Sequence, residues 1–286
     1  MKVRKAVIPA AGFGTRFLPA TKALPKEMLT VVDKPLIQWT VEEAVGSGLD
    51  KIGIVTSRGK SVFEDHFDRS PELEAFLQGK GKTDLLEDVL RISRLAEFAY
   101  IRQPQALGLG HAILMGETFV AGEPFAALTP DDIYDCRPPC TRQLIDVFLE
   151  KKATVIVLGR IDAEGTKKYG VIKPRQVSER VFQVLDMAEK PGPEKAFSDL
   201  GILGRYVFTP EIFEAIKKTP PDHKGEVQIT DAIRVLLDTQ PVYGVLFEGR
   251  RYDCGDKFGF LEATVNLALK RPEFADRLRS LIKSVL

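Results

Sequence analysis

Short apolar runs alternate with longer segments of helical periodicity along most of the 286 residues. The run Lys5–Pro9 is typical of a buried strand, residues 36–45 repeat their apolar side chains at helical spacing, and Lys51–Thr56 again resembles a buried strand. Because a helix between two strands usually connects parallel neighbours, this alternation predicts an α/β fold. We expect a mixed, mainly parallel central sheet flanked by helices.

The same alternation continues to the end of the chain, although it becomes less regular in the second half. Further strands are expected at residues 98–103, 125–128, 154–160, 170–174, 205–208 and 242–247. Further helices are expected around Phe63, Leu86, Leu144, Ile212, Ile233 and Leu261. In open sheets of this kind ligands bind beyond the carboxyl ends of the strands, so catalytic and binding residues are expected in the loops that follow them.

Charge and composition exclude several classes of protein. The 41 basic and 40 acidic side chains leave a formal charge of +1, which gives no general attraction to nucleic acid or to an anionic membrane. The N-terminal residues lack the apolar core of a signal peptide, and no apolar stretch reaches the roughly 20 residues of a membrane span. We therefore expect a cytoplasmic protein. Its three cysteines are too few and too irregularly spaced for a disulfide framework or a zinc site and are expected to be buried thiols.

A glycine-rich loop follows the first predicted strand. Gly12 and Gly14 let the backbone come close to a ligand and direct N–H groups at a phosphate. A dinucleotide-binding loop would need glycine where Phe17 stands, and a Walker A loop would need Gly-Lys-Ser/Thr after its spacer. Neither pattern fits. Arg16 and Lys26, however, follow the glycines closely in the sequence, and the charge of a triphosphate needs several cations distributed along it.

Several longer strings in this chain resemble those of the sugar-nucleotide pyrophosphorylases, which belong to the sugar nucleotidyltransferase family. The closest resemblance is to the bacterial UTP–glucose-1-phosphate uridylyltransferases, also called UDP-glucose pyrophosphorylases. The motifs occur in the family's order over nearly the whole chain: GFGTR, PATKALPKEML, DKPLI, LGLGHA, PDD, YGVI, EKP, GRYVF, GEVQITDA and YDCG.

The resemblance implies a Rossmann-like nucleotidyltransferase fold and an Mg²⁺-dependent enzyme. Its reaction would join UTP to glucose 1-phosphate and release UDP-glucose and pyrophosphate. We expect a single domain spanning residues 1–286, with a nucleotide-binding part at roughly 1–135 and a sugar-binding and C-terminal part at roughly 136–286. The family also implies a homodimer or homotetramer, and apolar helical positions near the C-terminus would either pack between subunits or close the monomer's own core: Leu261, Val265, Leu267, Leu278 and Ile282.

By the same resemblance, nucleotide-binding residues lie in two segments. In the first, Ala10, Ala11, Gly12 and Gly14 would lie against the nucleotide, while Arg16 and Lys26 would be the catalytic cations that stabilise charge at the α-phosphorus.

In the second segment, Gln103 and Gly108 would read the pyrimidine edge through an amide side chain and a backbone group. Without the resemblance, Gln103 is simply a polar residue that ends a strand. The roles of Lys22 and His111 stay open: Lys22 could share the work of Lys26 or be a surface cation, and His111 could cap the next helix or lie near the nucleotide.

Two aspartates are the predicted metal ligands. Asp131 follows a predicted strand at residues 125–128, where Mg²⁺ could bridge it to phosphate oxygens, and neighbouring Asp132 would point elsewhere in an extended chain. Asp253 matches a second metal-binding acid in related nucleotidyltransferases, and for uridylyltransferases the resemblance leaves open whether it contacts the metal directly. Each aspartate could instead be a turn or cap residue.

The sugar phosphate is assigned to three residues of the second half. Gly170, Glu189 and Lys190 match the family's hexose-binding positions, where a carboxylate accepts from sugar hydroxyls and an ammonium meets the phosphate. Alone, Glu-Lys-Pro would be an exposed turn. No general base is needed, because a phosphate monoester with a second pKa of about 6 is already largely dianionic near neutral pH.

Three alternatives remain at this point. A thymidylyl- or cytidylyltransferase would share the glycine loop, the lysine and the acids. A non-catalytic nucleotide-sugar sensor would keep the fold without the reaction, and an NAD-dependent oxidoreductase is disfavoured by Phe17. The sequence departs from many relatives in two places. It has Thr30-Val-Val-Asp33 where they have a proline, and its segment between Asp132 and Lys151 is shorter than in some of them. These departures leave the proposed site residues in place but bear on subunit contacts and loop closure.

Overall fold

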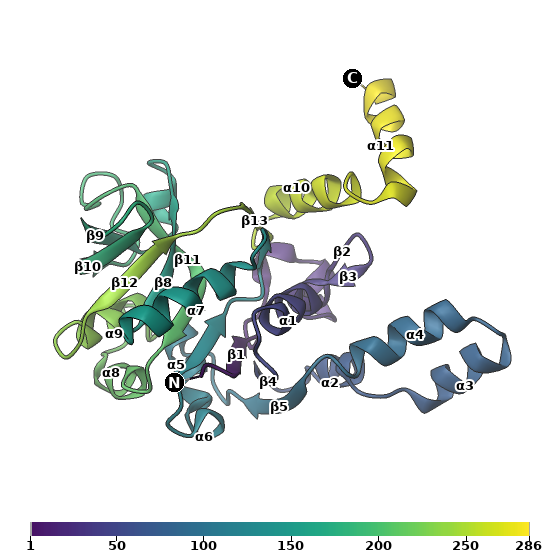
Figure 1. Cartoon of the computed structure of the whole chain (residues 1–286), viewed down its shortest axis with the longest axis horizontal. Coiled ribbons are helices and arrows are strands. Elements are labelled where there is room, and N and C mark those ends of the chain that lie inside the picture. The colour runs from purple at the N-terminus through teal and green to yellow at the C-terminus, as the bar shows by residue number, and fades with distance from the viewer. Residues whose placement is uncertain (1, 286) are drawn as a thin grey trace.

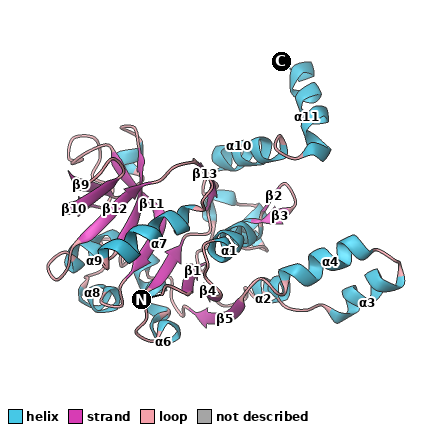
Figure 2. Cartoon of the chain, viewed as in Figure 1, coloured by secondary structure: helices cyan, strands magenta, loops and turns pink. Residues whose placement is uncertain are grey.

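A nine-stranded sheet forms the centre of the protein, as the computed structural model of residues 2–285 shows (Figures 1 and 2). The strands are ordered β5-β4-β1-β6-β11-β8-β12-β10-β9. Their bounds are β1 Lys5–Pro9, β4 Lys51–Thr56, β5 Glu97–Arg102, β6 Phe125–Leu128, β8 Val155–Arg160, β9 Val171–Gln176, β10 Val181–Ala188, β11 Leu200–Phe208 and β12 Val242–Leu246. Strands β11 and β10 run opposite to the others, so the predicted mixed, mainly parallel sheet is confirmed.

Helices cover both faces of this sheet, because its strands are apolar on both sides. One face packs against α5 (Gly108–Met115), α8 (Ile212–Lys218) and α9 (Ile229–Leu236). The other face packs against α1 (Leu36–Gly46), α2 (Val62–Phe67) and α7 (Cys140–Lys151). The sheet is therefore enclosed, and ligands can reach it at the ends of the strands.

Smaller elements extend from this central body. Strands β2 (Thr30–Val31) and β3 (Lys34–Pro35) form a short hairpin. Strands β7 (Asp132–Asp135) and β13 (Arg250–Asp253) form a separate antiparallel pair that packs with α10 (Lys257–Ala268). The short helix α6 (Glu117–Val120) follows α5.

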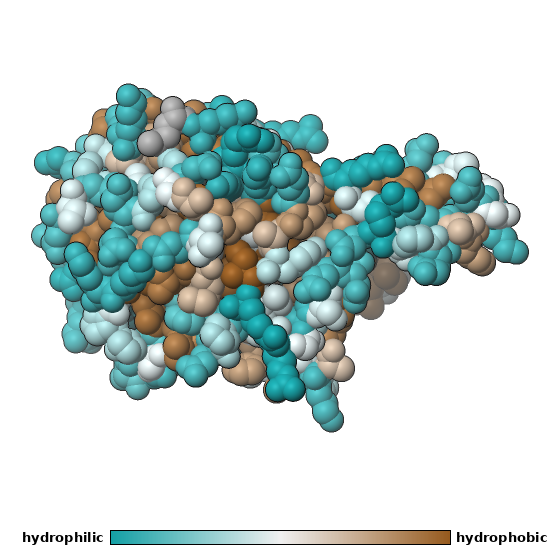
Figure 3. Space-filling model, turned by 90° about the horizontal axis from the view of Figure 1, so that it is seen from below, coloured by the Kyte–Doolittle hydropathy of each residue, from teal (hydrophilic) through white to brown (hydrophobic). Residues whose placement is uncertain are grey.

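Two helical projections leave the body (Figure 1). One is an arm made of α3 (Pro71–Gly79) and α4 (Thr83–Ile92), and the other is formed by α10 with the terminal helix α11 (Pro272–Val285). Hydrophilic side chains dominate the face drawn in Figure 3, with apolar side chains in scattered patches. Within residues 2–285, every helix is too short or too polar to cross a bilayer.

The predicted strands and helices all occur; β1, β4 and β6 keep their predicted bounds, and the bounds of the other predicted strands shift by one to a few residues. β11 is the largest change, because it begins at Leu200 and not at residue 205. The three cysteines are free thiols, but Cys136 is only partly buried, which corrects the expectation of three buried thiols.

Candidate active site

The glycine loop leaves the carboxyl end of β1 and turns through three short 3₁₀ segments, Thr15–Phe17, Ala20–Lys22 and Lys26–Met28. Gly14 starts the first of them in the left-handed region, with φ 64°, where a side chain would be strained. A Cβ there would also lie 3.1 Å from the Cβ of Lys26, and Thr21 donates to the Gly14 carbonyl at 2.8 Å. Glycine therefore lets the loop fold back so that Lys26 lies beside it.

Lys26 forms an ion pair with Asp131, the acid in the turn between β6 and β7. The Lys26 Nζ donates to Asp131 Oδ2 at 2.7 Å, and the two side chains are only 17% and 22% exposed. Although burial opposes both charges, Lys26 lowers the pKa of Asp131 to about 2, and Asp131 raises the pKa of Lys26. Both groups are therefore charged at neutral pH.

Asp131, Asp253 and Arg16 meet at Gly255, which follows β13. A Cβ on Gly255 would lie 3.0 Å from Asp253 Oδ1, 3.1 Å from Asp131 Oδ2 and 3.2 Å from Arg16 Nη1. The Gly255 N–H also donates to Asp253 Oδ1 at 3.0 Å. The absence of a side chain at Gly255 thus allows two carboxylates and a guanidinium from three distant segments to share one space.

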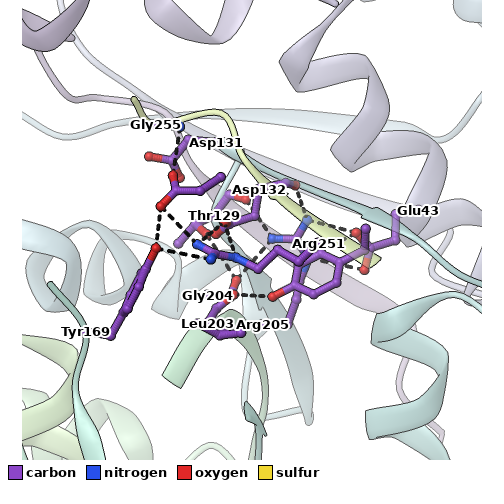
Figure 4. Close-up of polar contacts among 12 residues, drawn as sticks. Glu43, Thr129, Asp131, Asp132, Tyr169, Leu203, Gly204, Arg205, Arg251 and Gly255 are labelled. Atoms are coloured by element: carbon purple, nitrogen blue, oxygen red, sulfur yellow. Dashed lines mark hydrogen bonds and ion pairs between the residues drawn. The ribbon is translucent and has the colours of Figure 1, made fainter. Parts of the chain in front are cut away.

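A second network holds the neighbouring residues (Figure 4). Asp132 points away from Lys26, as its extended backbone predicted: its Oδ2 accepts from the Thr129 hydroxyl at 2.8 Å and its Oδ1 from Arg251 Nε at 2.6 Å. Burial, together with Asp131, raises the pKa of Asp132 to about 6 in spite of Arg251. Arg251 also lies 3.4 Å from Asp253 Oδ2, so it links the β7 and β13 acids.

Tyr169 completes this network beside the sugar-assigned residues. Its hydroxyl donates to Asp253 Oδ2 and accepts from Arg251 Nη1 at 3.1 Å (Figure 4). One oxygen of Asp253 is thereby held, while Oδ1 stays turned toward Gly255.

Arg205, on strand β11, supports the turn that contains Asp131. Its side chain is fully buried and pairs with Glu43 of α1, with Nη2 2.8 Å from Glu43 Oε2. The same guanidinium donates to the carbonyls of Thr129 at 2.7 Å and Asp132 at 2.8 Å, on either side of Asp131 (Figure 4). Gly204 allows this close packing, because a Cβ there would lie 2.1 Å from the Thr129 hydroxyl oxygen.

Gln103, one of the residues assigned to the base, lines a separate cavity of about 510 Å³ together with Ala11 and Phe13. Gln103 is buried, and its Nε2 lies 3.3 Å from the Gly108 carbonyl and 2.9 Å from His111 Nδ1. Gly108, at φ +90°, begins α5.

His111 lies inside α5 and not at its start, so the helix-cap interpretation of His111 is wrong. Burial lowers its pKa, which keeps the ring neutral and able to accept from the Gln103 amide. His111 therefore orients the amide that faces the cavity.

The residues assigned to the sugar line a cavity of about 580 Å³, and Arg16, Asp131 and Asp253 line it too. Glu189 Oε1 pairs with Lys190 at 2.8 Å, and its Oε2 accepts from Thr230 at 2.7 Å. A Cβ on Gly170 would lie 2.7 Å from the Thr230 hydroxyl oxygen, so glycine leaves this hydroxyl room to hold Glu189.

The donor set suits a hard cation bound with substrate. In residues 2–285 no three acidic, histidine or cysteine side chains gather tightly enough to hold a metal by themselves. Asp131 and Asp253, however, present one oxygen each to the space at Gly255. Mg²⁺ commonly takes one or two carboxylates and completes its shell with substrate phosphates and water, so these two acids fit it.

Most of the predicted site residues are thus brought together, and the sequence missed several that support them. Lys22 is exposed and ends a 3₁₀ segment at Ala20–Lys22, and its role stays open. The missed residues are Glu43, Lys60, Arg205, Thr230 and Arg251. Arg205 gave a usable signal, since an arginine within an apolar strand needs a buried acidic partner.

Comparison with known proteins agrees with this geometry. The family model described as "Nucleotidyl transferase" matches residues 5–270. A curated relative from Bacillus subtilis (strain 168), named UTP–glucose-1-phosphate uridylyltransferase, is 49% identical over 285 residues, covering 100% of this chain and 98% of the relative. A relative with the same name from Staphylococcus epidermidis is 47% identical over 284 residues, covering 99% of each chain.

Solved structures give the same result. A UDP-glucose pyrophosphorylase complexed with UDP-glucose is 41% identical with a TM-score of 0.87, covering 94% of this chain and 100% of that one. A UTP-bound enzyme from Acinetobacter baumannii is 36% identical with a TM-score of 0.92 and full coverage of both chains. Sequence and structure together establish that this chain belongs to the nucleotidyl transferase family.

Proposed function

We propose that this chain is a UTP–glucose-1-phosphate uridylyltransferase, which makes UDP-glucose and pyrophosphate from UTP and glucose 1-phosphate. The observation that supports it most strongly is the meeting of Arg16, Asp131 and Asp253 at Gly255, on the wall of the cavity that Glu189 also lines. Relatives that match the full chain have this activity in their names, and similar structures are described as holding UTP or UDP-glucose.

In this proposal the nucleotide lies along the glycine loop. Ala10, Ala11, Gly12 and Gly14 approach it with their backbone, since Gly12 has open space where a Cβ would stand. The Gln103 amide, held by His111, offers both a donor and an acceptor to the uracil edge. Gly108 lies beside this amide and completes the base subsite.

Glucose 1-phosphate occupies the larger cavity. Glu189 accepts hydrogen bonds from sugar hydroxyls, and Lys190 pairs with the phosphate. Gly170 has no side chain, so the sugar ring can lie directly against the cavity wall there. Thr230 donates to Oε2 of Glu189, and Lys190 pairs with Oε1. When the sugar binds, one of its hydroxyls can take the place of Lys190 at Oε1.

The transfer step needs no covalent intermediate with the enzyme. An oxygen of the glucose 1-phosphate attacks the α-phosphorus of UTP in line, and the bond to the β-phosphate oxygen breaks as pyrophosphate leaves. Arg16 and Lys26 stabilise the negative charge that develops. For Lys26 to reach a phosphate, its ammonium must share or leave its contact with Asp131, and Mg²⁺ at this acid would favour that exchange.

Asp131 and Asp253 would hold the Mg²⁺, which would supply positive charge to offset that of the phosphates. We therefore expect excess EDTA to abolish pyrophosphate release, and added Mg²⁺ to restore it. Calorimetric titration should show Mg²⁺ binding much more tightly with UTP present, since two carboxylates alone make an incomplete shell. Full turnover of metal-free protein would contradict this role.

We also propose one domain, with its nucleotide-binding part at about 1–135 and its sugar-binding part at about 136–286, because the central sheet draws strands from both. A cytoplasmic homodimer or homotetramer is proposed as well. Exposed Leu261 and Val265 support subunit packing through α10, whereas buried Leu267 belongs to the monomer's own core. Leu278 and Ile282 are half-buried.

The function is tested by measuring pyrophosphate release with Mg²⁺ while crossing UTP, dTTP, CTP and ATP with glucose 1-phosphate and other hexose 1-phosphates. We expect a strong preference for UTP with glucose 1-phosphate. Preference for another pair would assign a different substrate within the same family. Tight binding of a nucleotide sugar without release from any pair would replace the enzyme by a sensor.

A further inference from the structure

Lys60 lies between β4 and α2, outside the motifs assigned to substrate, yet its side chain reaches into the first loop. Its Nζ donates to the carbonyls of Ala10 and Gly12, each at 2.7 Å. The same nitrogen lies 3.5 Å from Glu27 Oε2. One ammonium thus joins the start of the glycine loop, the segment that contains Lys26, and the loop after β4.

This contact is buried in an unusual way for a lysine. The Lys60 side chain is 12% exposed and that of Glu27 is 1% exposed. Burial lowers the pKa of Lys60 and raises the pKa of Glu27, so each charge is disfavoured except where it meets an opposite one. A buried ion pair usually stabilises a fold no more than a pair of apolar side chains of similar size would. Its position at the nucleotide loop therefore indicates a role other than stability.

The geometry bears on how the loop can bind phosphate and ribose. In a peptide chain the carbonyl and N–H groups of successive residues are linked by planar peptide units, so fixing the carbonyls of Ala10 and Gly12 also fixes the N–H groups that follow them. The Ala10 N–H is itself held by the Val55 carbonyl at 2.7 Å. Lys60 therefore holds a stretch that contains glycine and would otherwise be free to change conformation.

We propose that Lys60 is a positioning residue for UTP: it holds the Ala10–Gly12 backbone in its nucleotide-binding conformation, and Glu27 keeps its ammonium in place. The inference rests on the proposed function, because it concerns the UTP subsite of that reaction. Lys60 acts through the loop and does not take part in the transfer step. Its loss should weaken UTP binding more than it slows turnover.

The test compares Lys60→Met with the double variant Lys60→Met/Glu27→Gln. The single variant leaves the buried Glu27 with Lys26 as its remaining neighbouring cation and without its contact to Lys60, so it should unfold at a lower temperature and bind UTP poorly. The double variant removes both charges and should recover the melting temperature. If the lysine positions the loop, the KM for UTP stays raised by about tenfold or more in the double variant, with little change in kcat or in the KM for glucose 1-phosphate.

Lys5→Met is the matched control. Lys5 stands at the other end of β1, is 11% exposed, and likewise donates to a backbone carbonyl, that of Val120 at 2.9 Å, and to a carboxylate, that of Glu123 at 2.8 Å. It should leave the KM for UTP unchanged. If the single variant does not fold, the double variant gives the comparison by itself, and equilibrium binding of UTP can be measured without turnover.

A KM for UTP that returns to the wild-type value in the double variant would overturn the proposal, because Lys60 would then serve only to neutralise Glu27. An unchanged KM in the single variant would overturn it as well. Wild-type protein in the same assay separates the proposed function from the proposed role of Lys60. If the wild-type protein turns over UTP and glucose 1-phosphate, the proposed function is supported whatever the Lys60 variants show. Absent turnover would count against the function, while UTP binding to the variants would still test Lys60.

Discussion

Replacing Asp131 by asparagine is expected to lower pyrophosphate release by about a thousandfold. Asparagine keeps the shape of the side chain but removes the charge that faces the space at Gly255 and pairs with Lys26. The proposed metal would lose a carboxylate, and Lys26 would lose its partner. Steady-state rates at saturating UTP, glucose 1-phosphate and Mg²⁺ measure the effect.

Asp135→Asn is the matched control for this change. Asp135 lies on β7, four residues along the chain, with a side chain 27% exposed and paired with Lys270 away from Gly255. Its substitution should leave the rate within about twofold of wild type, as is usual for an exposed ion pair. Circular dichroism confirms that both variants are folded. A folded Asp131→Asn protein with a near-normal rate would remove this acid from the mechanism.

Replacing Arg205 by methionine is expected to destabilise the fold by about 3–5 kcal/mol. The change leaves the buried Glu43 carboxylate without its cation and removes the donors to the Thr129 and Asp132 carbonyls. Urea unfolding followed by the fluorescence of Trp39, the chain's single tryptophan, measures the loss. Activity should fall as well, because the turn that presents Asp131 loses its support.

Arg160→Met gives the comparison for an exposed pair. Arg160 is 66% exposed and faces Asp199, which is 53% exposed, so its loss should cost no more than about 1 kcal/mol. Similar urea midpoints for Arg205→Met and Arg160→Met would show that the buried Arg205–Glu43 pair contributes no more to stability than an exposed pair. The double variant Arg205→Met/Glu43→Gln should recover part of the lost stability, because no charge is then left unpaired.

The sheet and its helices were predictable where the pattern was strong. Strand β1 matches its prediction at both ends, because a short apolar run that ends in proline just before a glycine-rich loop has few other structures open to it. Strand β10 was missed: Gln183 and Asp186 interrupt its apolar run, and a bulge between Val184 and Asp186 breaks the alternation of its buried residues. The β7–β13 pair was also missed, since its strands are short and Asp135 pairs with Arg250, 115 positions further along the chain.

The candidate site shows the same limit. Motifs led to Lys26 and Asp131, and the structure places these residues in contact. The partners of Arg251 and Arg205 could not be assigned from local pattern, because Asp132 and Glu43 lie 119 and 162 residues away along the chain. The tertiary fold selects these partners, so a single sequence gives the residue type but not the contact.

The central claim is nucleotidyl transfer at the α-phosphorus, and UTP with a radioactive α-phosphorus tests it most directly. With glucose 1-phosphate and Mg²⁺, the label should appear in UDP-glucose, and label at the γ-phosphorus should appear in pyrophosphate. Label from the α-position in UMP, or label from the γ-position in a sugar product, would contradict the account.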